Sequence, residues 1–180
     1  MDFARVLDTV GRFLDERGFR YALVGAFALS AYGLSRATQD IDLAVDAGAR
    51  RDLVPFLESL GYETLYCSEG YSNHVHSLPE LGRVDCIYVA GPTATRLFES
   101  ATSVPVFGKA ICVPKPEHLA AMKVLAMKND PARTFREMAD LQHLLGLPGI
   151  DLDEVRGYFE RYALLERFDE LRRILDSTRP

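Results

Sequence analysis

The sequence predicts a mixed α/β fold: a β-sheet flanked by helices, followed by a C-terminal helical segment. Apolar residues at helical spacing open the chain, and short strand-like runs separated by turn residues follow as far as residue 113. Beyond Pro114 the apolar pattern has only the helical period. We therefore expect an α/β core over residues 1–113 and a helical segment over residues 114–180 that packs on it.

The core is expected to begin with a helix over about residues 3–17, because Phe3 to Leu14 carry an apolar stripe and Gly18 suits a helix end. Next come a strand, a short helix, a polar loop and a second strand: Tyr21–Val24, a helix to about Gly33, Ser35–Gln39 and Asp40–Val45. A helix over Arg50–Leu60 follows and stops at Gly61.

Three further strands, a short helix and a hairpin complete the expected core: Tyr62–Cys67, Ser72–Leu78, Arg83–Val89, Thr93–Ser100, Val104–Phe107 and Ala110–Val113. The three strands form a meander beside the first two, so the sheet is mixed and not all-parallel. Four helices are expected in the C-terminal segment: His118–Met127, Thr134–Leu145, Asp153–Ala163 and Leu165–Leu175.

The strand Asp40–Val45 begins with Asp-Ile-Asp-Leu. Side chains alternate between faces of a strand, so Asp40 and Asp42 share one face while Ile41 and Leu43 point into the core. Two carboxylates ~7 Å apart repel by about 2 kcal/mol at an effective dielectric near 20. A divalent cation such as Mg²⁺ reverses that sign, because it prefers oxygen ligands. The alternative is a strand end that dips into solvent.

The strand before it ends at Gly25, and a helix is expected to start at once. Backbone N–H groups at such a helix start attract anions. A phosphate cradle and a pair of carboxylates would then lie on consecutive strand ends, which is the order that a metal–nucleotide site needs.

Val-Gly-Ala, a spacer of thirteen residues and Asp-Ile-Asp-Leu together resemble the core motif of the DNA polymerase β-like nucleotidyltransferase superfamily. The longer run A-x-x-x-Y-G-x-x-R-x-T-x-D-I-D-L, from Ala28 to Leu43, is similar to the abortive-infection and toxin–antitoxin branch. The family usually has Gly-Ser or Gly-Gly where this chain has Gly25-Ala26, which removes one hydroxyl donor but keeps the backbone donors. The resemblance covers about residues 20–90 well and 115–145 loosely.

The resemblance implies a Mg²⁺-dependent transfer of a nucleoside monophosphate from an NTP to an acceptor hydroxyl, with release of pyrophosphate. It implies that the metal is held by Asp40, Asp42 and Asp85, and that Asp85 also acts as general base. The residues expected at the triphosphate are Gly25, Ala26, Arg36 and Lys123.

From the residues alone, Asp85 is a single acid inside an apolar strand, and a salt bridge to a neighbour such as Arg83 is the alternative to a metal role. Lys123 and Asp140 lie on helices where solvated surface positions are the alternative. The resemblance implies instead a lysine and an aspartate that face the cleft and act in catalysis. We expect Lys123 at the edge of a buried stripe made by Leu119, Met122, Leu125 and Ala126.

The net charge of −5 argues against a surface that coats nucleic acid generally. The three cysteines are odd in number and lack CxxC spacing, which indicates a reducing compartment. The N-terminus does not resemble a signal peptide, and no apolar run has membrane-spanning length, so a cytoplasmic protein without a membrane role is expected. The pair His74-x-His76 shares a strand face but has no evident third metal ligand, so both are expected at the surface or beside substrate.

Two other functions remain open at this point. One is a non-catalytic partner in a toxin–antitoxin pair that keeps the fold, although the three intact aspartates count against it. The other is an antibiotic-modifying enzyme, which needs an acidic pocket for a cationic drug. For an active transferase the acceptor is RNA, protein or a small molecule, and a cognate antitoxin is an expected partner of a toxin.

Overall fold

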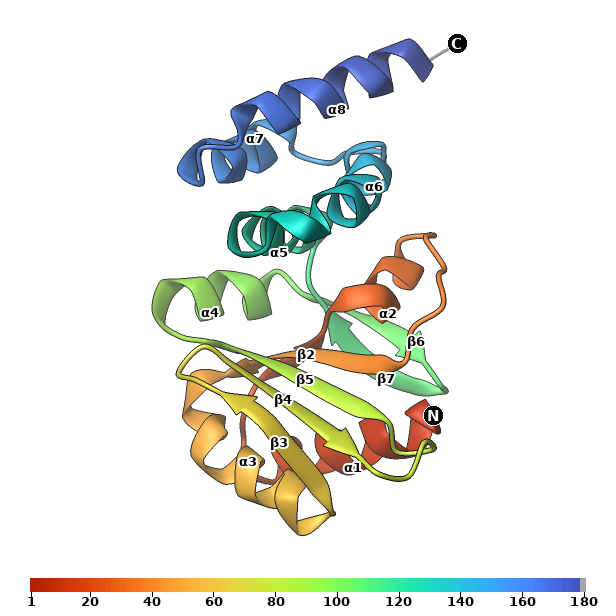
Figure 1. Ribbon diagram of the computed structural model, residues 1–180, viewed down its shortest axis with the longest axis vertical. Coiled ribbons are helices and arrows are strands. Elements are labelled where there is room, and N and C mark those ends of the chain that lie inside the picture. The colour runs from red at the N-terminus through yellow and green to blue at the C-terminus, as the bar shows by residue number, and fades with distance from the viewer. Residues whose placement is uncertain (179–180) are drawn as a thin grey trace. The chain divides into compact units, whose positions relative to one another are not determined.

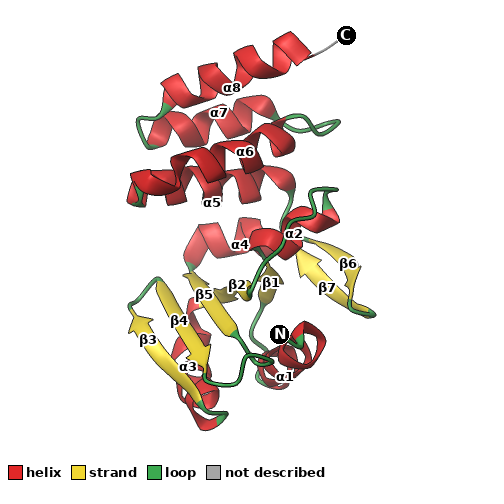
Figure 2. Ribbon diagram, turned by 45° about the vertical axis from the view of Figure 1, so that its right-hand side comes forward, coloured by secondary structure: helices red, strands yellow, loops and turns green. Residues whose placement is uncertain are grey.

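The computed structural model describes residues 1–178 of the 180-residue chain. The chain divides into two compact units, which are described separately. The first comprises residues 1–31 and 35–114, and the second comprises residues 32–34 and the chain from Lys115 onward. Figure 2 distinguishes their strands and helices by colour.

A five-stranded sheet of order β1-β2-β5-β4-β3 forms the centre of the first unit (Figure 1). Its strands are β1 (Tyr21–Leu23), β2 (Asp40–Asp46), β3 (Tyr62–Cys67), β4 (Tyr71–His76) and β5 (Arg83–Val89). The strands β2 and β5 run parallel, and every other neighbouring pair is antiparallel. The predicted mixed α/β sheet is therefore confirmed, with β3, β4 and β5 as the expected meander.

One face of this sheet is buried and the other is partly exposed. Helices α1 (Phe3–Glu16) and α3 (Arg50–Ser59) lie behind the sheet in Figure 1. Alternate strand residues such as Ile41, Leu43 and Val84 are at most 1% exposed, whereas the residues between them are partly exposed. The charged residues of β2 and β5 therefore share the second face.

The remaining elements of this unit are α2 (Gly25–Ala31), a 3₁₀ turn (Ala47–Ala49), α4 (Gly91–Glu99), β6 (Thr102–Val106) and β7 (Lys109–Val113). The strands β6 and β7 form a separate two-stranded sheet, the predicted hairpin. Its turn places Phe107 in the left-handed region at φ 50°, next to Gly108. The Phe107 ring is held there by contacts with the rings of Phe3 and Phe27.

The second unit is helical, with α5 (Pro116–Asn129), a 3₁₀ turn (Pro131–Arg133), α6 (Thr134–Leu145), α7 (Leu152–Arg161) and α8 (Leu165–Thr178). Helix α5 starts two residues earlier than predicted, because Pro116 occupies the first turn, where a missing N–H costs nothing. The large side chains buried in this unit include Leu141, Leu144, Phe159 and Leu171.

The predicted buried stripe of α5 is wrong. Leu125 is 38% exposed and Met122 is partly exposed, while Lys123 is only 8% exposed. Helix α5 packs against both α6 and α7, and apolar residues surround most of its circumference. The apolar residues of α5 therefore do not indicate which side of the helix is buried. The side that carries Lys123 is buried because Glu137 and Asp140 of α6 form ion pairs with it. Among residues 1–178, no helix is both long and apolar enough to cross a lipid bilayer.

Candidate active site

Three aspartates converge on the partly exposed face of the sheet. In the parallel pair β2/β5, Asp42 lies directly opposite Asp85, and Asp40 lies opposite Arg83. Because residues two apart on a strand share a face, Asp40, Asp42 and Asp85 all point the same way. One carboxylate oxygen from each lies within 4.8 Å of the others. Residues 43 positions apart in the sequence thus form one acidic cluster.

Asp85 is held by a residue that the sequence analysis missed. The Tyr71 hydroxyl on the neighbouring strand β4 donates a hydrogen bond of 2.9 Å to Asp85 Oδ2. The other oxygen, Oδ1, is buried and has no hydrogen-bond partner within the described residues. The alternative of a salt bridge to Arg83 is wrong, because Arg83 acts on this carboxylate only through space. Burial raises the pKa of Asp85, while the Tyr71 hydrogen bond and the charge of Arg83 oppose that rise.

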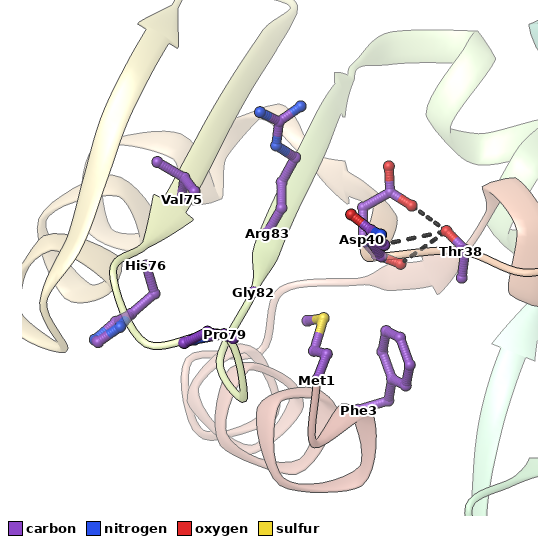
Figure 3. Close-up of a pocket in the computed structure, with 10 residues that line it drawn as sticks. Met1, Phe3, Thr38, Asp40, Val75, His76, Pro79, Gly82 and Arg83 are labelled. Atoms are coloured by element: carbon purple, nitrogen blue, oxygen red, sulfur yellow. Dashed lines mark hydrogen bonds between the residues drawn. The ribbon is translucent and has the colours of Figure 1, made fainter.

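Asp40 also has a neighbour that was not anticipated. The Thr38 hydroxyl lies two residues before it and donates to Asp40 Oδ1 (Figure 3). This contact orients one carboxylate of the cluster. The Thr-x-Asp spacing is visible in the sequence, so it is the one local signal from which this contact could have been predicted.

Gly25 touches the acidic cluster from the other side. Its φ of +62° favours glycine, and a Cβ built on it would lie 1.9 Å from Asp42 Oδ2. The Val24 amide donates to the Asp42 carbonyl at 2.9 Å, which joins this turn to β2. Ala26 is buried, and Arg36 is exposed on the loop before β2.

The cluster has the chemistry of a divalent-cation site. Three carboxylates that approach this closely repel one another unless a cation lies between them. A buried carboxylate oxygen without a hydrogen bond, Asp85 Oδ1, is costly unless it has a ligand. Carboxylate oxygens are the ligands that Mg²⁺ prefers. Asp40, Asp42 and Asp85 are therefore the residues that would hold such an ion.

No protein-family model and no curated protein matches the chain. Solved structures do match. The antibiotic-resistance factor ANT(2'')-Ia aligns with 98% of this chain and 94% of its own, at a TM-score of 0.57 and 17% identity. A nucleotidyltransferase-like protein from Paracoccidioides brasiliensis aligns over 97% and 92%, at a TM-score of 0.58 and 16% identity. This chain has a nucleotidyltransferase fold.

The lincosamide antibiotic adenylyltransferase LnuA gives the same result, with a TM-score of 0.55, 16% identity, and alignment over 78% of this chain and 94% of its own. The likeness concerns the fold alone. The acidic cluster of this chain lies on the sheet of that fold.

The second unit of this nucleotidyltransferase fold contains the other two predicted catalytic residues, which contact each other. Lys123 Nζ on α5 lies 2.6 Å from Asp140 Oδ2 and 2.8 Å from Glu137 Oε2, both on α6. Glu137 is fully buried, and its Oε1 also accepts from Arg133 and Arg136. Burial raises the pKa of Glu137, but Lys123 and Arg133 outweigh it, so this pKa lies below its ordinary value. The alternative of solvated surface positions for Lys123 and Asp140 is therefore wrong.

The His74-x-His76 pair has no capacity left for a metal. His74 is fully buried, not at the surface as expected, and its nitrogens lie 3.0 Å from Thr64 Oγ1 and 2.8 Å from Ser72 Oγ. His76 Nδ1 accepts from the Leu78 amide, and its Nε2 lies 3.2 Å from the Leu60 carbonyl oxygen. Both histidines therefore have structural roles.

Proposed function

We propose that this protein is a Mg²⁺-dependent nucleotidyltransferase that moves a nucleoside monophosphate from an NTP to an acceptor hydroxyl and releases pyrophosphate. The observation that carries this proposal is the cluster of Asp40, Asp42 and Asp85, with oxygens within 4.8 Å of one another and Asp85 Oδ1 buried without a hydrogen bond. A nucleotidyltransferase fold around that cluster supports the same chemistry.

The three aspartates would hold the metal. When bound, Mg²⁺ neutralises phosphate charge and makes the acceptor hydroxyl more acidic. Gly25 lies against Asp42. The backbone at Gly25 and Ala26 would bind the triphosphate, with Arg36 offsetting its charge. These assignments place the donor on the Gly25 side of the cluster.

Asp85 would accept the proton of the attacking hydroxyl. Burial raises the pKa of this carboxyl, which makes it a better base at neutral pH than an ordinary aspartate. The hydrogen bond from Tyr71 fixes the orientation of this carboxylate.

We propose that Lys123 binds the NTP phosphates and that Asp140 acts in turnover. We expect Lys123→Ala to raise the KM for NTP and Asp140→Ala to lower kcat. The ion pair between them also gives each a structural role. Activity must therefore be compared at temperatures where both variants are folded.

The run from Ala28 to Leu43 favours a member of the abortive-infection and toxin–antitoxin branch, with a cognate antitoxin as partner. The alternative, a non-catalytic partner with this fold, predicts that the protein does not turn over NTP. All three carboxylates are present and converge, which favours the active enzyme.

Thermal denaturation with Mg²⁺ and each NTP tests the proposal. A ligand that binds only the folded state raises the melting temperature. We expect a rise for the wild type, none for Asp40→Asn or Asp42→Asn, and an unchanged rise for the control Asp52→Asn on the exposed side of α3. The absence of any Mg²⁺-dependent rise in the wild type would refute the site. Labelled NTP incubated with cell lysate then identifies the acceptor.

A further inference from the structure

A cavity of about 660 Å³ opens beside the acidic cluster, wholly within the first unit. Met1 and Phe3 line it from the start of α1, Val75 and His76 from β4, and Arg83 from the start of β5 (Figure 3). Thr38, Gln39 and Asp40 line its β2 side, and Pro79 and Gly82 its remaining wall. The volume is in the range that holds a small organic ligand.

Asp40 connects this cavity to the chemistry, since it is both a member of the acidic cluster and a lining residue. Gly25 touches Asp42, so the turn assigned to the donor meets the cluster at a different aspartate. An acceptor seated in the cavity would approach the metal site along Asp40, while the donor occupies the Gly25 side. The two substrates would then meet at the carboxylates.

Arg83 sets the charge of the cavity. It is the one cationic side chain among the ten lining residues, and Asp40 is the one acidic side chain. Within residues 1–178 the Arg83 guanidinium makes no hydrogen bond or ion pair, although the Arg83 backbone lies opposite Asp40 and Val75 in the sheet. Both nitrogens of His76 contact backbone groups, so neither is available to a ligand in the cavity.

We propose that this cavity is the acceptor subsite and that it takes a small hydroxyl compound carrying an anionic group, which Arg83 binds. The proposal rests on the proposed nucleotidyl transfer. Within the described residues the Arg83 guanidinium has no hydrogen-bond or ion-pair partner, so its N–H groups are open to an anion. A guanidinium binds phosphate or carboxylate with two parallel hydrogen bonds. The same charge disfavours a polycationic acceptor such as an aminoglycoside.

The remaining lining fits such a compound. Met1, Phe3, Val75 and Pro79 give an apolar wall for a carbon skeleton. In the transfer step, the acceptor oxygen forms a bond to the α-phosphorus of the NTP while the bond from that phosphorus to the bridging oxygen breaks. Pyrophosphate leaves with the bonding electrons, and the hydroxyl proton passes to Asp85.

Titration of the protein by ¹H–¹⁵N NMR tests the subsite without turnover. The probes are ribose 5-phosphate, ribose and glycerate, added without NTP. We expect ribose 5-phosphate to shift the amides of Val75 and Arg83, and ribose to bind about 10- to 100-fold more weakly, as the loss of charged hydrogen bonds requires. Tighter binding of glycerate than of ribose 5-phosphate would assign the anion as a carboxylate, and the reverse as a phosphate.

Variants locate the charge that matters. Arg83→Ala should lower the affinity for ribose 5-phosphate by about 10- to 100-fold and leave the affinity for ribose unchanged. If the alanine variant misfolds, Val75→Glu serves in its place. It puts a carboxylate opposite Arg83 and should lower the affinity for ribose 5-phosphate by a similar factor. Arg51→Ala, exposed on α3, is the matched control. Asp42→Asn should lose Mg²⁺·NTP binding but keep ribose 5-phosphate at the cavity.

Equal binding of ribose and ribose 5-phosphate, or shifts confined to residues around Gly25, would overturn the acceptor assignment. The assignment would also be overturned if Arg83→Ala weakened the binding of Mg²⁺·NTP, ribose and ribose 5-phosphate to the same extent. Arg83 would then act only on the carboxylates of the cluster. Failure of wild-type protein to bind any NTP with Mg²⁺ overturns the proposed transfer itself, which is a separate measurement.

Discussion

The Tyr71 hydroxyl donates to Asp85 Oδ2 at 2.9 Å, and the second oxygen of Asp85 remains buried without a hydrogen bond. The tyrosine thus fixes the carboxylate in one orientation and leaves one oxygen for a cation. Groups that orient a metal ligand in this way usually change metal affinity or activity by 10- to 100-fold when removed.

Tyr71→Phe should therefore raise the Mg²⁺ concentration needed for half-maximal activity by roughly tenfold or more. The ring stays, so packing is kept and only the hydrogen bond is lost. Tyr66→Phe is the control, because Tyr66 lies on the next strand and is 58% exposed. A Tyr71→Phe enzyme with a wild-type Mg²⁺ requirement would show that Asp85 needs no support from β4.

Asp85→Asn separates binding from chemistry. Asp40 and Asp42 remain, so Mg²⁺·NTP should still raise the melting temperature. Turnover should fall by about 10²–10⁴-fold, the usual effect of losing a general base. Equal losses of binding and turnover in calorimetry and kinetics would make Asp85 a metal ligand without a proton-transfer role.

Gly25→Ala tests the turn against Asp42. The new Cβ would meet Asp42 Oδ2 at 1.9 Å, and φ is +62°. We expect a loss of about 1–2 kcal/mol of folding free energy from the backbone alone, and no stabilisation by Mg²⁺·NTP. Gly70→Ala is the matched control, because no atom lies within 4 Å of the added carbon. Urea denaturation with and without ligand measures both effects. Retained NTP binding in Gly25→Ala would exclude this turn as the triphosphate site.

The buried ion pairs of the helical unit predict a stability effect. Lys123→Ala removes the cation beside Glu137 Oε2 and Asp140, and both of these carboxylates are nearly or fully buried. The substitution should lower the free energy of unfolding by about 3–5 kcal/mol. Lys128→Ala, exposed on the same helix, should stay within about 0.5 kcal/mol. Urea denaturation decides between them, and similar stabilities for the two variants would contradict a buried network.

Local sequence predicted most of the first unit, because its strands alternate clearly. Ile41 and Leu43 point inward and Asp40 and Asp42 outward, as the period of two requires. Convergence of Asp85 on that pair depends on the β2/β5 register, which no local pattern encodes; the family resemblance supplied it.

Contacts between distant elements were not predictable in the same way. The Tyr71–Asp85 hydrogen bond arises from the pairing of β4 with β5, and nothing around Tyr71 in the sequence indicates it. The apolar positions of α5 alone predict Lys123 at the edge of a stripe, and a lysine is rarely buried without a partner. Its burial becomes favourable only once α6 supplies Glu137 and Asp140.

The fully buried His74 predicts how stability depends on pH. Thr64 donates to Glu58, so its oxygen accepts from His74 Nδ1, and Nε2 then accepts from Ser72, 2.8 Å away. This network suits the neutral ring, and burial lowers the pKa of His74 below its ordinary value. The unfolded chain therefore takes up this proton first as the pH falls below about 6.5, and stability declines by at most about 1.4 kcal/mol per pH unit. Stability from His74 is complete above that pH.

Urea denaturation between pH 7 and 5 should show the decline in the wild type and in His76→Gln, and a shallower one in His74→Gln. An NMR titration that places the His74 midpoint at or above 6.5 would contradict the argument.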